Sequence, residues 1–175
     1  MRGEAAVLTP EGKGTGGGAR PLESAPPPRP PGGLPVPGAR AIDHTADIGL
    51  ELEAPHLPAL FERAAFAAVW MALEAPVPPA ATRRALCLSA GDLPALLRRW
   101  LQEILYWQEV DGLAPSEFGP VGIEAGGPGP AAIEATVALG RIEAKPVREI
   151  KGVTYHGLAA DRRRGGWYAR VVFDV

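Results

Sequence analysis

Glycine and proline are distributed so unevenly that they divide this 175-residue chain into two unlike parts. Residues 1–38 hold 9 of the 22 glycines and 9 of the 20 prolines. Such a segment, which also has few aromatic or β-branched residues, cannot bury enough apolar surface to offset the entropy lost on ordering. We therefore expect a disordered extension over 1–38 and a single folded domain over 39–175.

Charge and cysteine content exclude several classes of protein. The chain has 18 Lys and Arg residues and 20 Asp and Glu residues. The extension holds 4 of the basic and 3 of the acidic residues, so the body (39–175) has 14 basic and 17 acidic residues and a net charge of −3. A negative body argues against direct nucleic-acid affinity. The single cysteine, Cys87, excludes an internal disulfide and fits a reducing compartment. The longest mostly apolar run, 64–73, is too short to cross a membrane, so we expect a soluble cytoplasmic protein.

Hydrophobic periodicity predicts six strands and two helices in the body. Period-two alternation begins at Ile48, and helical spacing follows over 56–73. The clearest helix has Asp92 as its N-cap, Pro94 in its first turn and Gly112 at its end. The other expected strands cover 82–90, 116–124, 131–142, 147–160 and 167–175, with DRRRGG as a hairpin turn. This order predicts an α+β fold, with two α-helices packed against a mostly antiparallel sheet.

The segment Asp43-His44-Thr45-Ala46-Asp47 gathers two carboxylates, an imidazole and a hydroxyl just before an apolar strand. It has two interpretations of similar weight. In one, it is a polar loop whose side chains bond to nearby backbone amides. In the other, it is an anionic or metal-binding mouth at the end of a sheet.

The chain ends in an apolar strand that stops at Asp174-Val175. There the α-carboxylate lies beside the Asp174 side chain, and two negative groups repel unless a cation or donor separates them. With Asp47 nearby, the site would contain only oxygen ligands, which suit calcium or magnesium better than zinc. The alternative is a solvated terminus with screened charges.

Two positively charged parts of the sequence also have more than one possible role. Lys151 lies in a predicted strand, where it could cover apolar surface, pair with a carboxylate or present its ammonium to a phosphate. The run Arg162-Arg163-Arg164 fits a solvated hairpin tip and, as the minor alternative, a contact with RNA.

Four segments together resemble the archease family. They are DHTADIGLEL (43–52), LPALFERAAFA (57–67), IKGVTYHGL (150–158) and GWYARVVFDV (166–175), so the resemblance spans essentially the whole body. The sequence departs from the family pattern at the start of the first helix, which lacks the usual acidic first turn, and at Gly152, where alanine is common. These departures bear on the partner-facing surface of that helix and on no proposed ligand.

The resemblance implies a small cytosolic α+β protein that activates the RtcB-type RNA ligase. That ligase uses GTP and manganese to join RNA ends in tRNA splicing and RNA repair. The archease promotes its guanylylation and multiple turnover without being an enzyme itself. Family members hold a calcium-type cation, or another hard divalent cation, at positions that correspond to Asp47, Asp174 and Val175. We place Lys151, Asp43 and His44 on the surface that faces the ligase.

Two other functions are compatible with the residues. One is a metal-dependent phosphoester hydrolase that uses Asp47 and Asp174, although no nucleophile or general base is evident beyond His44 or His156. The other is an RNA-binding or chaperone-like module, against which the body charge of −3 argues. We expect RNA to be involved only indirectly, through the ligase.

Overall fold

The computed structural model describes residues 34–43, 47–127 and 129–175. Two helices and eight strands lie in these ranges. Their bounds are β1 (Ala39–Asp43), β2 (Ile48–Ala54), α1 (Leu57–Leu73), β3 (Thr82–Ala90), α2 (Leu93–Val110), β4 (Leu113–Glu124), β5 (Ala131–Arg141), β6 (Gly152–Val153), β7 (Ala159–Arg163) and β8 (Gly166–Asp174). Apart from its last five residues, the expected extension lies outside the described residues. Within those five, Val36 is buried against the body.

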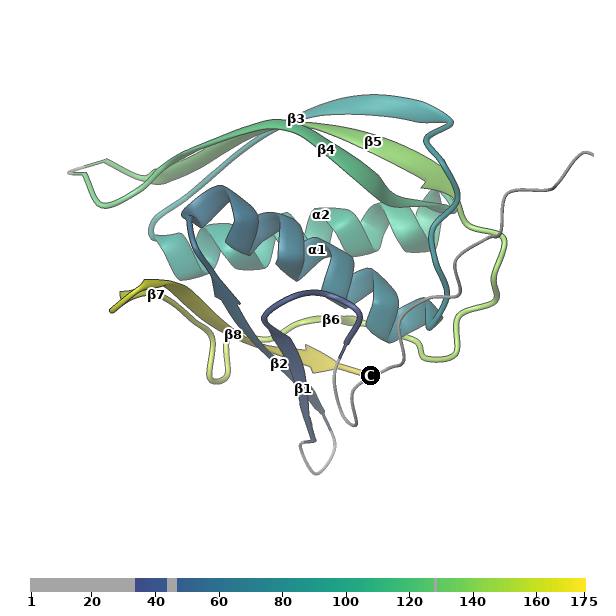
Figure 1. Cartoon of the computed structure of the whole chain (residues 1–175), viewed down its shortest axis with the longest axis horizontal. Coiled ribbons are helices and arrows are strands. Elements are labelled where there is room, and N and C mark those ends of the chain that lie inside the picture. Colours follow the sequence, from purple (N-terminus) through teal and green to yellow (C-terminus); the bar gives the residue numbers. More distant parts are fainter. Residues whose placement is uncertain (1–33, 44–46, 128) are drawn as a thin grey trace, which may run out of the picture.

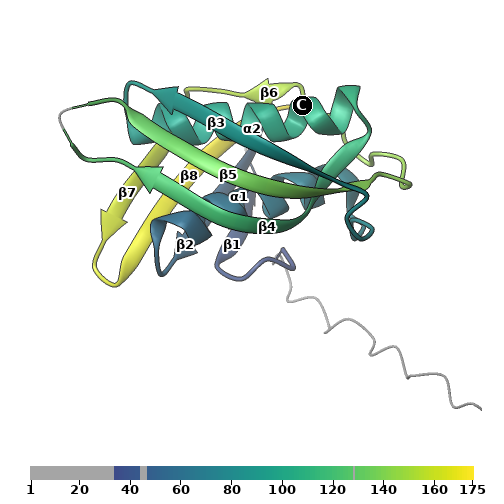
Figure 2. The ribbon, with the colours of Figure 1, turned by 90° about the horizontal axis from the view of Figure 1, so that it is seen from above.

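The strands form two sheets that enclose both helices (Figures 1 and 2). One sheet has the order β1-β2-β8-β6, with β7 also paired to β8, and the other has the order β3-β5-β4. Every strand pairing in the described ranges is antiparallel. The predicted α+β class is therefore confirmed, but the strands divide into two sheets where the sequence suggested one.

The amino-acid composition of α1 explains its position between two sheets. Its alanines and larger apolar residues are buried on nearly every side, including Phe61, Ala64 and Ala68. A helix that is apolar all round must be covered all round. Contacts of α1 with both β2 and β4 provide this cover.

The predicted starts of both helices are confirmed. The Asp92 carboxylate accepts a hydrogen bond from the Ala95 amide at 2.8 Å, as an N-cap should. In α1 the cap is His56, whose Nδ1 accepts from the Ala59 amide at 3.2 Å. Neither helix in the described ranges is long and apolar enough to span a bilayer.

The two helices meet through a fully buried tryptophan. The indole Nε1 of Trp100, on α2, donates to the Phe61 carbonyl of α1 at 3.0 Å. The same indole contacts the ring of Phe118, on β4, with ring centroids 5.7 Å apart. Trp100 therefore connects both helices to the β3-β5-β4 sheet while keeping its only polar group bonded.

The predicted strand over 147–160 is wrong. Only Gly152–Val153 of β6 and the first residues of β7 are strand in this range. The amides of Val147 and Arg148 donate to the Ala72 carbonyl at the end of α1, so this segment is used to cover a helix terminus. The sequence also missed β1, and the DRRRGG turn is shorter than expected because Asp161–Arg163 belong to β7.

Candidate metal centre

Strand β8 lies between β2 and β6 and ends beside the C-terminus of the chain (Figure 1). The strand pairings place the candidate residues at this end of β8. In the β2–β8 pairing, Ile48 is opposite Phe173. Asp47 precedes Ile48 and Asp174 follows Phe173, so the two aspartates extend neighbouring strand ends. Asp47 is half-buried and Asp174 is exposed.

Strand β6 brings the lysine to the same end of the sheet from the other side. Gly152 is opposite Asp174, and the Lys151 amide donates to the Asp174 carbonyl at 2.8 Å. The Lys151 ammonium donates to the main-chain oxygen of Val175 at 3.0 Å. The strand pairings thus bring residues from three separate parts of the sequence to the same end of β8.

Phe173 explains why β8 runs to the end of the chain instead of fraying. Its side chain is fully buried, as are the side chains of Val171 and Ala169 on the same face. This buried face anchors the strand in the core, so the next two residues are held at the sheet edge.

Two of the residues that we had placed on the partner-facing surface are described only in part or not at all. The backbone of Asp43 ends β1, where it is opposite Ile48. His44 lies outside the described residues. The placement of both on a ligase-facing surface stays a prediction.

A residue that the sequence reasoning missed holds the lysine segment in place. Arg98, on α2, donates through Nε to the Val153 carbonyl at 2.8 Å. Its guanidinium carbon also lies 4.2 Å from the ring centroid of Tyr155. An arginine on one helix face gave no signal of this contact, because its partner is 55 residues away in sequence.

The donor set fits a hard divalent cation. Asp47, Asp174 and Val175 supply oxygen only, and calcium-type ions prefer carboxylate and main-chain oxygens. In the described part of the chain, no group of three His, Cys, Asp or Glu side chains could hold a metal. A cation site here would therefore depend on the oxygens of the terminal residue, and the Lys151 ammonium already lies on one of them.

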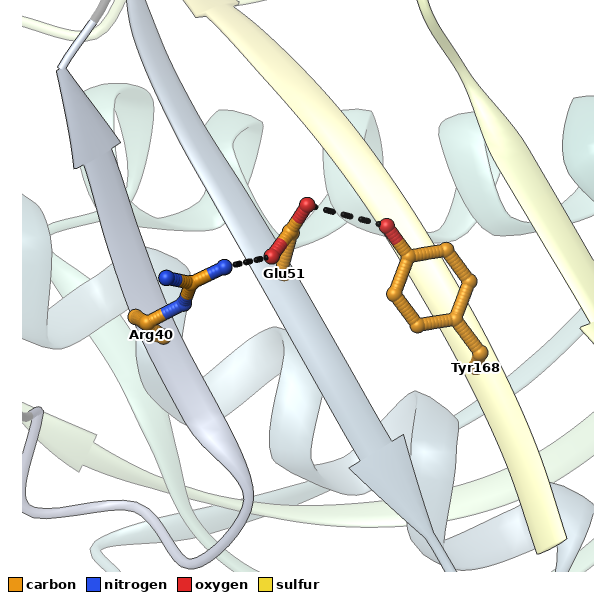
Figure 3. Close-up of polar contacts among 3 residues, drawn as sticks. All are labelled: Arg40, Glu51 and Tyr168. Atoms are coloured by element: carbon orange, nitrogen blue, oxygen red, sulfur yellow. Dashed lines mark hydrogen bonds and ion pairs between the residues drawn. The ribbon is translucent and has the colours of Figure 1, made fainter.

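A second polar arrangement crosses the outer face of the same sheet (Figure 3). Glu51 on β2 is ion-paired with Arg40 on β1, and it accepts a hydrogen bond from the Tyr168 hydroxyl of β8 at 3.1 Å. The hydrogen bond from Arg40 holds the pKa of the Glu51 carboxyl below its ordinary value. Burial, together with the bond to Glu51, raises the pKa of Tyr168.

The sequence of this chain is similar to that of known proteins over the whole folded body. The model of the Archease protein family (MTH1598/TM1083) matches residues 40–175. A protein archease of Methanosarcina acetivorans is 36% identical over 138 residues, which cover 77% of this chain and 93% of that protein. One of Archaeoglobus fulgidus is 31% identical over 139 residues, covering 78% and 98%.

Two solved structures share the fold. Protein 1598 of Methanobacterium thermoautotrophicum superposes with a TM-score of 0.64 at 27% identity, covering 79% of this chain and 99% of that one. A Thermotoga maritima protein, described as an archease and "possible chaperone", gives a TM-score of 0.53 at 22% identity, covering 77% and 94%. This chain belongs to the archease protein family.

Proposed function

We propose that this protein is a cytoplasmic, non-catalytic activator of an RtcB-type RNA ligase in tRNA splicing and RNA repair. It promotes guanylylation of the ligase and multiple turnover through a calcium-type site. The observation that carries the proposal is the convergence of Asp47, Lys151, Asp174 and Val175 at one end of β8. Membership of the archease family supports the proposal, because the resemblance to that family implies a ligase activator.

Two features of this chain would act together: a cation site and the positively charged side chain of Lys151. Asp47, Asp174 and the Val175 oxygen would hold the cation, which would neutralise the negative charges gathered at the terminus. Lys151 is exposed and keeps its ammonium on the Val175 oxygen, so it can present positive charge toward a partner. Arg98 fixes the backbone two residues after Lys151 and so limits where that ammonium can lie.

An activator with these parts needs no catalytic step of its own. Its ordered, charged end would lie against the nucleotide or metal site of the ligase and favour the guanylylated form. Such action is differential binding to one state of the partner. A chaperone-like role, the description given to the Thermotoga maritima protein, shares the partner-binding step but predicts no dependence on the cation.

The test is multiple-turnover ligation by the ligase of the same organism, with wild-type protein, Asp47→Asn or Asp174→Asn. These changes keep side-chain size while removing charge. The matched control is Glu134→Gln, an exposed carboxylate on the other sheet. We expect both aspartate variants to lose the stimulation of turnover and Glu134→Gln to keep it.

Calcium binding supplies a readout that does not involve the ligase. A cation that binds the folded state raises the melting temperature by mass action. We expect calcium to stabilise the wild type and Glu134→Gln but neither aspartate variant. Stimulation that survives in both aspartate variants would refute the site, whereas phosphoester turnover by the protein alone would favour the hydrolase alternative.

A further inference from the structure

A basic hollow lies beside the turn between β7 and β8. Figure 2 shows this turn at the opposite end of β8 from the C-terminus, where the candidate metal centre is. Its volume is about 400 Å³. Its lining includes Arg163, Arg164, Trp167 and Tyr168 from the two strands and their turn, and Arg63 and Glu53 from α1 and β2. We call the four residues from β7, β8 and their turn the arginine hairpin.

The arginine hairpin carries positive charge that the fold itself does not neutralise. Among the residues that the structure describes, the ion pairs are Arg40–Glu51 and Arg84–Asp111, so neither Arg163 nor Arg164 is in one. Both are exposed. Glu53 is the one carboxylate that lines the hollow, against three arginines. This local excess contrasts with the negative charge of the body as a whole.

Within the arginine hairpin, Arg163 and Tyr168 are held against each other by the fold itself. The Arg163 guanidinium carbon lies 3.3 Å from the centroid of the Tyr168 ring. That ring is held in turn, because the Tyr168 hydroxyl bonds to Glu51, which is paired with Arg40 (Figure 3). A guanidinium stacked on one face keeps its N–H edge and its other face available for further contacts.

We propose that the arginine hairpin binds single-stranded RNA. Arg163 and Arg164 contact backbone phosphates, and a base stacks beside Trp167 or on the open face of the Arg163 guanidinium. Cationic groups alternating with planar ones are the combination by which proteins hold single strands without reading their sequence. An acidic peptide would use the charges but not the planar surfaces, so the observations favour RNA.

This site extends the proposed function and differs from the indirect role that the sequence led us to expect for RNA. Strand β8 has nine residues, so its two ends are about 30 Å apart. One rigid strand would therefore hold the metal centre at the ligase while the arginine hairpin contacts the RNA substrate. Direct binding can be measured without any ligase, so failure of the activator proposal and failure of this one are distinguishable.

The experiment measures fluorescence anisotropy of a labelled ten-nucleotide single-stranded RNA with the full chain, from 50 to 200 mM salt. Two phosphate contacts on a single strand predict a log–log slope of about −1.4, or about a sevenfold loss of affinity over this range. The variant Arg163→Glu/Arg164→Glu should bind about tenfold more weakly at low salt and should lose most of this slope. Its melting temperature shows whether it remains folded.

The matched control is Arg83→Glu/Arg141→Glu, which makes the same change in net charge at exposed positions on the other sheet. We expect it to bind RNA as the wild type does. The variant Arg163→Lys/Arg164→Lys should keep the salt slope but bind more weakly, because lysine does not stack as arginine does. The proposal is overturned if the wild type does not bind, if both double variants weaken equally, or if polyglutamate competes as well as unlabelled RNA.

Discussion

Removing the hydrogen bond between Lys151 and Val175 should change stability, calcium affinity and ligase activation in three different ways. In Lys151→Met the stem is kept while the 3.0 Å contact with the Val175 oxygen is lost. Lys151 is exposed, and solvent-exposed charged contacts contribute about 0–1 kcal/mol. We therefore expect the melting temperature to fall by less than about 5 °C.

Calcium affinity should change in the opposite direction. In the proposed site the Lys151 ammonium and the cation share the Val175 oxygen. At such a short distance the two positive charges repel each other. Two unit charges 4 Å apart interact by about 1 kcal/mol in water, and salt partly offsets the doubled charge of the cation. Removing the ammonium should therefore tighten calcium binding by about fivefold, measured by titration calorimetry.

Activation should nevertheless be lost, because the charge presented to the ligase is gone. Lys145→Met is the matched control, since Lys145 is also exposed and, among the described residues, makes no hydrogen bond or ion pair with the chain terminus. It should match the wild type in melting temperature, calcium affinity and stimulation of ligation. A fall of more than about 10 °C in Lys151→Met, or weaker calcium binding, would refute this reasoning, because the lysine would then support the site structurally.

Three further predictions concern the surrounding structure. Gly140→Ala should destabilise the protein by about 1–3 kcal/mol or more in denaturant unfolding, because the added Cβ would lie 2.1 Å from the Pro78 carbonyl oxygen; an unchanged midpoint would mean that the loop simply moves. Arg98→Ala should reduce stimulation of the ligase while leaving calcium-free stability within about 2 kcal/mol, because it releases the Val153 carbonyl; full stimulation would show that the lysine segment needs no such support. The lowered pKa of Glu51 means that its contribution to stability is complete above the unfolded value of 4.5 and is lost as the pH falls through the folded value, so Glu51→Gln should flatten the acid limb of a stability–pH curve, and a parallel curve would contradict this.

The secondary structure could be predicted well wherever its causes are local. The cap at Asp92, the proline after it and the apolar spacing that follows all lie within one or two helical turns, and the predicted helix agrees with α2. The predicted strand over 147–160 was wrong because most residues with this apolar alternation do not pair with another strand. Val147 and Arg148 bond to the end of α1, and only two residues pair as β6.

For the candidate site, the sequence suggested residue types but not how they are arranged. Asp47 and Asp174 could be proposed as oxygen ligands because the chemistry of carboxylates is visible in the sequence, and this assignment stays a prediction. That Lys151 reaches the same end of β8 depends on the pairing of β6, which no local pattern specified. The supporting role of Arg98 was invisible for the same reason.

The sequence by itself determined where both helices and most of the strands form, which residues bear charge and which family the chain belongs to. Tertiary structure alone decided that the strands form two sheets, that β2 and β6 flank β8, and that two charged clusters lie at opposite ends of that strand. The physical reason is the distance along the chain over which each interaction acts. Caps and periodicity act over a few residues, whereas strand register is fixed when buried faces such as that of Phe173 pack against elements distant in the chain.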